Sequence, residues 1–143
     1  MENSKQAKAG KVFYRRVRCQ YCNAISKVVQ GGVLYGAGHK LSNKEFYYCE
    51  PCEAWVGMHD INKKPFGTLA KSDLRKKRVL AHAEFDKVWK GKILEGYSKT
   101  AARQEAYEWL AKSLDIPINQ CHIGFFNVGE CNKTIAVCKA KKA

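Results

Sequence analysis

Two short cysteine motifs decide the fold of this chain: Cys19-Gln20-Tyr21-Cys22 and Cys49-Glu50-Pro51-Cys52. Each motif places two thiols on one tight loop, and 26 residues separate the two motifs. Four thiolates on two such loops are what a closed, tetrahedral Zn2+ site requires. The separation exceeds the usual spacing of roughly 15 to 20 residues, and a longer hairpin between the loops accommodates it. We therefore predict that Cys19, Cys22, Cys49 and Cys52 bind one structural zinc ion, in preference to four unligated thiols.

The other three of the seven cysteines, and two nearby histidines, are expected to lie outside this site. Cys121, Cys131 and Cys138 lack close spacing, and the last two fall on the inner face of a predicted helix, where small core residues are expected. His39 and His59 lie near the second motif and could replace one cysteine ligand or form part of another site. Ordinary surface or turn histidines are the favoured interpretation.

The sequence around the motifs is typical of short strands between residues 12 and 60. Glycine-rich turns at 31–32 and 36–38 separate the apolar runs, which are residues 12–17, 25–29 and 46–48. We predict a zinc ribbon of short antiparallel strands over residues 12–60. Residues 1–11 and 139–143 are polar and basic without apolar periodicity, so a flexible basic tail is expected at each end.

Helical periodicity replaces the strand pattern in residues 61–138. Thr68 is the predicted N-cap of a long amphipathic helix that ends near residues 89–91, with an apolar face of Ala70, Leu74, Ala81, Phe85 and Val88. A second helix is expected from Thr100 to Leu114, before Pro117. A third begins at the capping box formed by Asn127 and Glu130. The predicted fold is α+β, with the N-terminal ribbon followed by two or three packed helices.

The length and charge of the chain limit the classes of function that it can have. A chain of 143 residues suffices for one domain with a small metal-stabilised module, which excludes most multi-domain enzymes. The 26 Lys and Arg against 13 Asp and Glu give a net charge of +13, which suits a polyanionic partner such as nucleic acid. The longest uncharged stretch, 116–129, is shorter than the roughly 18 apolar residues of a membrane span. The first residues lack the apolar segment of a signal peptide, so we expect a cytoplasmic protein without membrane contact.

The first predicted helix is strongly basic. Residues 61–92 contain ten Lys or Arg against three Asp or Glu. At helical spacing one stripe beside the apolar face contains Lys71, Arg75, Arg78, His82, Asp86 and Trp89. We predict nucleic-acid contacts by five of these residues: Lys71, Arg75, Arg78, His82 and Trp89. Exposed rings of Tyr21, Tyr35 and Trp55 could stack on bases. The alternative is a solvated helix face with Trp89 in the core.

These residues together resemble a family of small zinc-finger-containing proteins found in bacterial and phage genomes. The matching stretches are RCQYCNA (18–24), YYCEPCEAWVGMHD (47–60), PFGTLAKSDLRKKRVLAHAEFDKVW (65–89), EAYEWLA (105–111) and CHIGFF (121–126). The resemblance covers about residues 17–138. It implies that the cysteine pairs are zinc ligands and that the ribbon and the basic helix form one unit, and it implies no particular activity.

Two functional hypotheses follow from these features. The first is a non-enzymatic zinc-ribbon protein that binds nucleic acid, with DNA and RNA both left open. The second is a protein-interaction module, for example a phage product that binds and modulates a host protein through its positive face. The sequence gives least support to an enzyme. His82 and Asp86, at i and i+4, could pair as a base and its orienting carboxylate, but no nucleophile or open metal position accompanies them.

Overall fold

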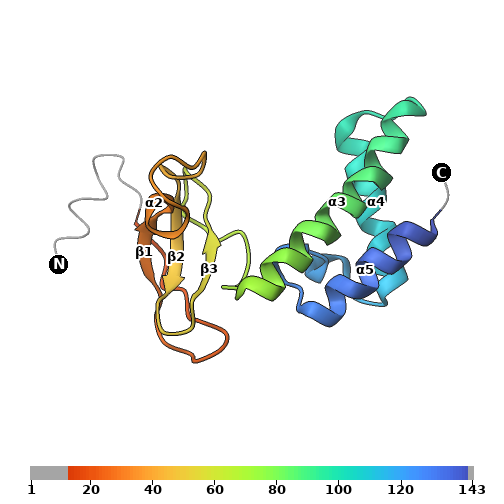
Figure 1. The fold of residues 1–143 in the computed structure, drawn as a ribbon. Helices are drawn as coiled ribbons and strands as arrows, with labels where there is room; N and C mark the ends of the chain where they lie inside the picture. The colour runs from red at the N-terminus through yellow and green to blue at the C-terminus, as the bar shows by residue number, and fades with distance from the viewer. Residues whose placement is uncertain (1–12, 142–143) are drawn as a thin grey trace. The chain divides into compact units, whose positions relative to one another are not determined.

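The computed structural model describes residues 13–141 and divides the chain into two compact units (Figure 1). The ribbon unit extends to Ser72 and the helical unit begins at Asp73. The predicted tail at residues 1–11 and the last two residues of the chain lie outside the described residues. Along the chain, the two units meet between residues 72 and 73, whereas the sequence pattern predicted a boundary after residue 60. The resemblance implied that the ribbon and the basic helix form one unit.

The ribbon unit contains a three-stranded antiparallel sheet with the order β1-β2-β3 (Figure 1). The strands are β1 (Lys27–Gln30), β2 (Glu45–Cys49) and β3 (Ala54–Gly57). β2 is rich in aromatic residues, which favour strands. In the register of the sheet, Lys27 of β1 and Trp55 of β3 both lie opposite Tyr48 of β2. The sheet and the helices that follow it confirm the predicted α+β class.

One face of the sheet carries the core of the ribbon unit. Side chains alternate across a strand, so Tyr47 and Cys49 lie on the same face of β2. They are buried in one cluster with Cys19, Ala54, Met58 and Leu69. The Tyr47 hydroxyl accepts a hydrogen bond from the Arg15 backbone N–H at 2.8 Å and donates one to the Lys63 carbonyl at 2.6 Å. These bonds attach the segments before and after the sheet to its buried face.

Two elements of the ribbon unit differ from the prediction. The glycines at 31–32 begin a short helix, α2 (Gly31–Tyr35), instead of a turn. A side chain at Gly31 is sterically excluded, because its Cβ would lie 1.9 Å from the Leu41 carbonyl oxygen. The described part of the apolar run at 12–17 forms no strand, and the backbone pairs beside β1 only as an isolated bridge between Arg18 and Ile25.

The long basic helix, α3 (Ser72–Leu94), begins three residues later than a Thr68 N-cap predicts, and it ends after the predicted residues 89–91. Thr68 is not its N-cap, because three residues separate Thr68 from Ser72, and the Thr68 hydroxyl accepts a hydrogen bond from the Gln20 side chain at 3.2 Å. Ala70 exchanges backbone hydrogen bonds of 3.0 and 3.1 Å with Trp55, which extends the sheet by one bridge. Residues up to 72 therefore belong to the ribbon unit, since their backbone polar groups pair with it.

Two further helices complete the helical unit, as predicted. α4 (Lys99–Leu114) is capped by Ser98 and ends at Asp115, which adopts a left-handed conformation. α5 (Val128–Ala140) follows two short 3-10 turns, Ile118–Gln120 and Ile123–Phe125. The predicted capping box is confirmed, with the Asn127 side chain accepting from the Glu130 N–H at 2.8 Å. α5 includes residues 139 and 140, which the sequence pattern assigned to a tail.

The helical unit has an apolar core of its own. Phe85 of α3 packs on Tyr107 of α4 with ring centroids 4.7 Å apart. The buried apolar residues from the three helices and the turns include Leu74, Ala81, Phe85, Ala102, Ala106, Leu110, Ile123 and Phe126. Within residues 13–141, no helix combines the length and the apolar character that a membrane span needs.

Candidate metal centre and charged surfaces

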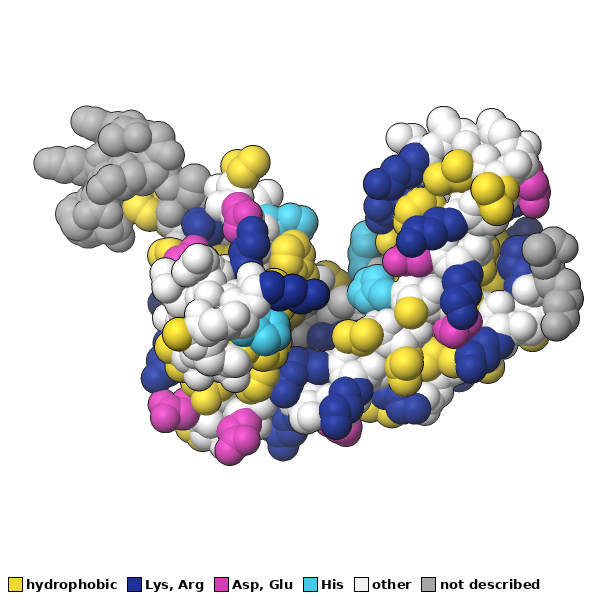
Figure 2. Space-filling model, turned by 45° about the horizontal axis from the view of Figure 1, so that its top comes forward, with side chains coloured by type: hydrophobic (Ala, Val, Ile, Leu, Met, Phe, Trp, Pro, Cys, Tyr) yellow, Lys and Arg dark blue, Asp and Glu magenta, His cyan; other side chains and the backbone are white. Residues whose placement is uncertain are grey.

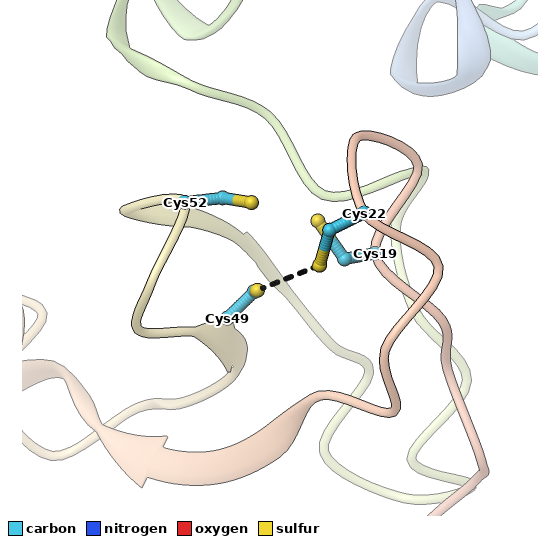
Figure 3. Close-up of side chains that lie close together, drawn as sticks. All are labelled: Cys19, Cys22, Cys49 and Cys52. Carbon is cyan, nitrogen blue, oxygen red and sulfur yellow. Dashed lines mark hydrogen bonds between the residues drawn. The ribbon is translucent and has the colours of Figure 1, made fainter.

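The four predicted cysteine ligands meet at one point of the ribbon unit (Figure 3). Their four Sγ atoms all lie within 4.8 Å of one another, and those of Cys22 and Cys49 are 3.6 Å apart. A tetrahedral ion with Zn–S bonds of about 2.3 Å separates its sulfur ligands by about 3.8 Å. The cysteines are thus positioned to bind one metal ion, and their number and softness match a structural Zn2+.

The residue that follows each cysteine pair adopts a left-handed backbone conformation. Asn23 follows the first pair with φ of 66°, and Glu53 follows the second with φ of 52°. This left-handed turn brings the Asn23 N–H to within 2.8 Å of the Cys19 carbonyl oxygen. The Tyr21 N–H points at the Cys19 sulfur at 3.4 Å. Each loop therefore holds its two thiols in a fixed orientation, and backbone N–H groups face the sulfur on which negative charge would rest.

The thiols compete with one another for protons. The backbone N–H of Ala24 lowers the pKa of Cys22, whereas burial raises the pKa of Cys49. Hydrogen bonding to Cys22 is the largest cause that raises the pKa of Cys52 to about 12. Four adjacent thiols resist ionising together because their negative charges repel. A divalent cation removes this repulsion, and a closed set of four thiolates leaves no open position for a reacting water.

The comparison with protein families agrees with this geometry. Residues 15–141 match the model of a zinc-finger-containing domain. The chain belongs to that family. No curated protein and no solved structure matches the chain.

The histidines near the second motif do not join the four sulfur atoms of the zinc-finger-containing domain. The His39 ring stacks on Tyr35 at 4.6 Å, and its Nδ1 accepts a hydrogen bond from the Leu41 N–H at 3.0 Å. The His59 ring meets the Phe66 ring edge-on at 4.5 Å. Among the described residues, the set that could hold a metal consists of the four predicted cysteines.

The three late cysteines of the domain are core residues. Cys121, Cys131 and Cys138 are all buried, as predicted for the last two. Burial raises the pKa of Cys121 and of Cys138 to about 11, and it also raises the pKa of Cys131. These thiols remain protonated at neutral pH and behave as small apolar side chains.

The predicted basic stripe of the domain is divided by burial. Arg78 is only 8% exposed, and its Nε and Nη2 both donate to the Phe126 carbonyl oxygen at 3.1 Å. Trp89 is also 8% exposed. The stripe is therefore not continuous at the surface, because the α3 face that carries these two residues packs inside the helical unit, and the burial of Trp89 matches the alternative that placed it in the core. His82 is exposed, and Arg75 is half-buried.

Lys71, the first residue of the predicted stripe, lies in the ribbon unit. Its N–H donates to the Tyr21 hydroxyl at 3.1 Å, and its Nζ lies 4.6 Å from the centre of the Tyr21 ring. Tyr21 remains 40% exposed. A cation and an exposed ring therefore lie together beside the first metal loop.

His82 and Asp86 do not form the base and carboxylate pair that their spacing allowed. Asp86 accepts a hydrogen bond from the Trp89 indole N–H at 2.9 Å. His82 places its Nδ1 3.0 Å from the Arg78 carbonyl oxygen, on its own helix. Both side chains thus bond within α3.

Three cations gather around the buried Trp89 ring, and none of them is among the nucleic-acid contacts predicted from the sequence. The Nζ atoms of Lys90 and Lys99 lie 5.6 and 5.7 Å from the ring centre, and the Arg103 guanidinium carbon lies 5.5 Å from it. We call Lys90, Lys99 and Arg103 the Trp89 cation cluster. The signal in the sequence was weak, because Lys99 and Arg103 reach Trp89 only when α3 and α4 pack together.

Proposed function

We propose that this zinc-finger-containing protein is a non-enzymatic nucleic-acid-binding protein in which the metal holds the ribbon unit. The Trp89 cation cluster is the observation that carries the proposal. Within the described residues, none of its three cations has a carboxylate within ion-pair distance. Three like charges near one ring repel each other, and a phosphate backbone relieves that repulsion.

The position of the cluster increases its attraction for anions. Lys99 is the first residue of α4, whose first turn contains no acidic residue. The N-terminus of a helix has a partial positive charge that adds to the charge of Lys99 and Arg103. Each ring contact keeps a cation near Trp89, so less side-chain entropy is lost when a phosphate binds.

The net positive charge of the helical unit as a whole is compatible with a nucleic-acid partner. From residue 73 onward the sequence has fourteen Lys and Arg against eight Asp and Glu. Lys and Arg side chains are spread widely over the visible face of the helical unit in Figure 2. Of the residues predicted from the sequence, Lys71, Arg75 and His82 stay proposed phosphate contacts, whereas buried Arg78 and Trp89 are reassigned to structural support.

A salt titration with matched charge changes tests the proposal. The variant Lys99→Gln/Arg103→Gln removes two cluster charges, and Lys112→Gln/Lys133→Gln removes two exposed charges elsewhere in the helical unit. The zinc-loaded full chain is titrated with labelled DNA and RNA, single-stranded and duplex, at several salt concentrations. We expect the cluster variant to lower the slope of log affinity against log salt by about 2, since each phosphate contact contributes about one unit.

The control separates local contacts from net charge. We expect Lys112→Gln/Lys133→Gln to bind with nearly the wild-type slope. An equal decrease of the salt slope in both variants would assign the binding to net charge and contradict the role of the cluster. Absence of binding to every nucleic acid at low salt, with one zinc bound, would contradict the proposed function.

The second candidate function, a protein-interaction module, is favoured by one feature of α3. Val79 and Leu80 are adjacent and are 67% and 52% exposed. Contiguous exposed apolar surface marks protein-interaction sites, and this pair contributes to such a surface. If this function holds, a complex captured from lysate survives nuclease digestion and is lost with Val79→Ser/Leu80→Ser. The same variant is expected to leave affinity for nucleic acid unchanged.

A further inference from the structure

The sheet face opposite the metal carries a continuous row of aromatic rings. Alternation along β2 places Phe46 and Tyr48 on this outer face, away from Tyr47 and Cys49. Trp55 of β3 lies directly opposite Tyr48, with ring centroids 5.9 Å apart. Tyr35 of α2 meets Trp55 edge-on at 5.8 Å, and His39 stacks on Tyr35 at 4.6 Å. We call His39, Tyr35, Trp55 and Tyr48 the aromatic row.

Hydrogen bonds hold three rings of the aromatic row, those of Trp55, Tyr35 and His39, before any ligand binds. The Trp55 indole N–H donates to the Tyr35 hydroxyl at 2.9 Å. The His39 Nδ1 accepts from the Leu41 N–H at 3.0 Å, and the two rings of the stacked pair are only 20° from parallel. Phe46 lies beneath Tyr35 and is 7% exposed, so it supports the row from below. Rings held in this way lose little conformational entropy when a flat ligand stacks on them.

The aromatic row lies at the surface of the ribbon unit, not in its core. Tyr35 is 37% exposed and His39 is exposed, whereas Tyr48 and Trp55 are half-buried. The buried cluster of the unit lies on the other face of the sheet and includes two of the metal ligands. Packing within the ribbon accounts for the half-buried rings of Tyr48 and Trp55, whereas the exposed rings of Tyr35 and His39 are available for a binding role.

The charge around the aromatic row suits a polyanion. Lys27 lies opposite Tyr48 in the sheet, and its Nζ is 5.9 Å from the centre of the Tyr48 ring. The same Nζ pairs with the exposed Glu50 carboxylate at 3.0 Å, so it is positioned beside the row and can exchange partners. Residues 13–72 contain nine Lys and Arg against four Asp and Glu.

We propose that the aromatic row binds unpaired bases of a single-stranded nucleic acid by stacking, with Lys27 beside the backbone. This inference rests on the proposed nucleic-acid function and specifies its ligand. A duplex keeps its bases stacked on one another and hidden from protein rings, whereas unpaired bases offer free π faces. Exposed rings beside a cation on a small sheet fit a single strand for this reason.

An abasic strand tests the proposal directly. The zinc-loaded full chain is titrated with a labelled single strand, with an abasic strand of equal length and charge, and with the corresponding duplex. We expect the single strand with bases to bind about tenfold or more tightly than the abasic strand, because stacking acts through the bases alone. DNA and RNA versions of each ligand are compared, since both offer the same π faces.

Substitutions in the row assign the effect to its residues. We expect Tyr48→Leu and His39→Ala each to weaken binding of the single strand several-fold to about tenfold, and to leave abasic binding unchanged. Phe125→Leu is the matched control, since Phe125 is an aromatic residue of the helical unit that is 50% exposed. Zinc content and thermal unfolding are measured for each variant. His39 is exposed, so its variant remains informative if Tyr48→Leu loses the fold.

The outcomes separate this inference from the proposed function. Equal affinity for the abasic and the base-containing strand, or unchanged binding by the His39 variant, would overturn the stacking role while phosphate binding stands. Preference for the duplex would also overturn it. Failure of the wild-type protein to bind any nucleic acid at low salt would overturn both.

Discussion

The ribbon unit and the helical unit both bury cysteines, but they use the sulfur atoms in opposite ways. In the ribbon unit four Sγ atoms lie within 4.8 Å of one another, and two of the ligands, Cys19 and Cys49, belong to its buried cluster. In the helical unit Cys121, Cys131 and Cys138 are buried, and desolvation keeps them protonated. The stability of the ribbon therefore depends on a metal ion, whereas that of the helical unit depends on apolar packing.

The largest expected effect comes from breaking the metal site. We expect Cys49→Ser to abolish zinc binding and unfold the ribbon unit, while the helical signal persists. Binding of a structural zinc contributes about 10 to 16 kcal/mol, more than a domain of this size gains in net stability. Metal content and the dispersion of backbone amide resonances in residues 13–72 check this.

The matched change in the other unit is Cys121→Ala, which removes a buried thiol but no metal ligand. We expect it to leave zinc content and the amide signals of the ribbon unchanged. A folded ribbon in Cys49→Ser, or loss of zinc in Cys121→Ala, would contradict the comparison between the two units.

A core truncation in the helical unit is expected to destabilise that unit and to leave the metal site of the ribbon unit intact. Phe85 is 1% exposed and packs on Tyr107. We expect Phe85→Ala to lower the free energy of unfolding of the helical unit by about 3 to 5 kcal/mol, because it removes buried area and leaves a cavity. Zinc content should not change. Urea denaturation followed by circular dichroism at 222 nm measures the loss.

The control for Phe85 lies on the exposed side of the same helix. Val79 is 67% exposed, so we expect Val79→Ala to change stability by less than about 0.5 kcal/mol. Equal losses in the two variants would show that α3 is not held by its buried face.

Sequence reasoning succeeded where the chemistry is local. A CxxC loop places two thiols within a few residues, so the four ligands followed from spacing, and the α+β class followed from the change from short apolar runs to helical periodicity. The capping box at Asn127 and Glu130 is also local and was confirmed. Each CxxC loop and the capping box are local patterns, and the two loops could be assigned to one site because a closed zinc site needs four thiolates.

The sequence pattern did not predict interactions between residues that are far apart in the chain. Helical spacing placed Arg78 beside the apolar face, and arginines are rarely buried without a partner. Its partner, the Phe126 carbonyl, is 48 residues away and is brought near only by the packed turns. The start of α3 was misplaced for the same reason, since Ala70 pairs with Trp55 across the chain.

The smallest predicted effect tests whether the helical unit is stabilised by many modest contributions. We expect Asn127→Ala to destabilise this unit by about 1 kcal/mol, because the Glu130 N–H loses its capping acceptor. Asn132→Ala, an exposed change in the same helix, should have a smaller effect. Glu130→Gln should retain most of the stability, since glutamine also accepts from the Asn127 N–H. Urea unfolding of the three variants checks this order.

An Asn127→Ala protein with the wild-type free energy of unfolding would contradict this order. Loss of zinc in any of them would show that the stability of the ribbon depends on α5, whereas a metal bound only by residues 19 to 52 predicts that zinc content is independent of the cap.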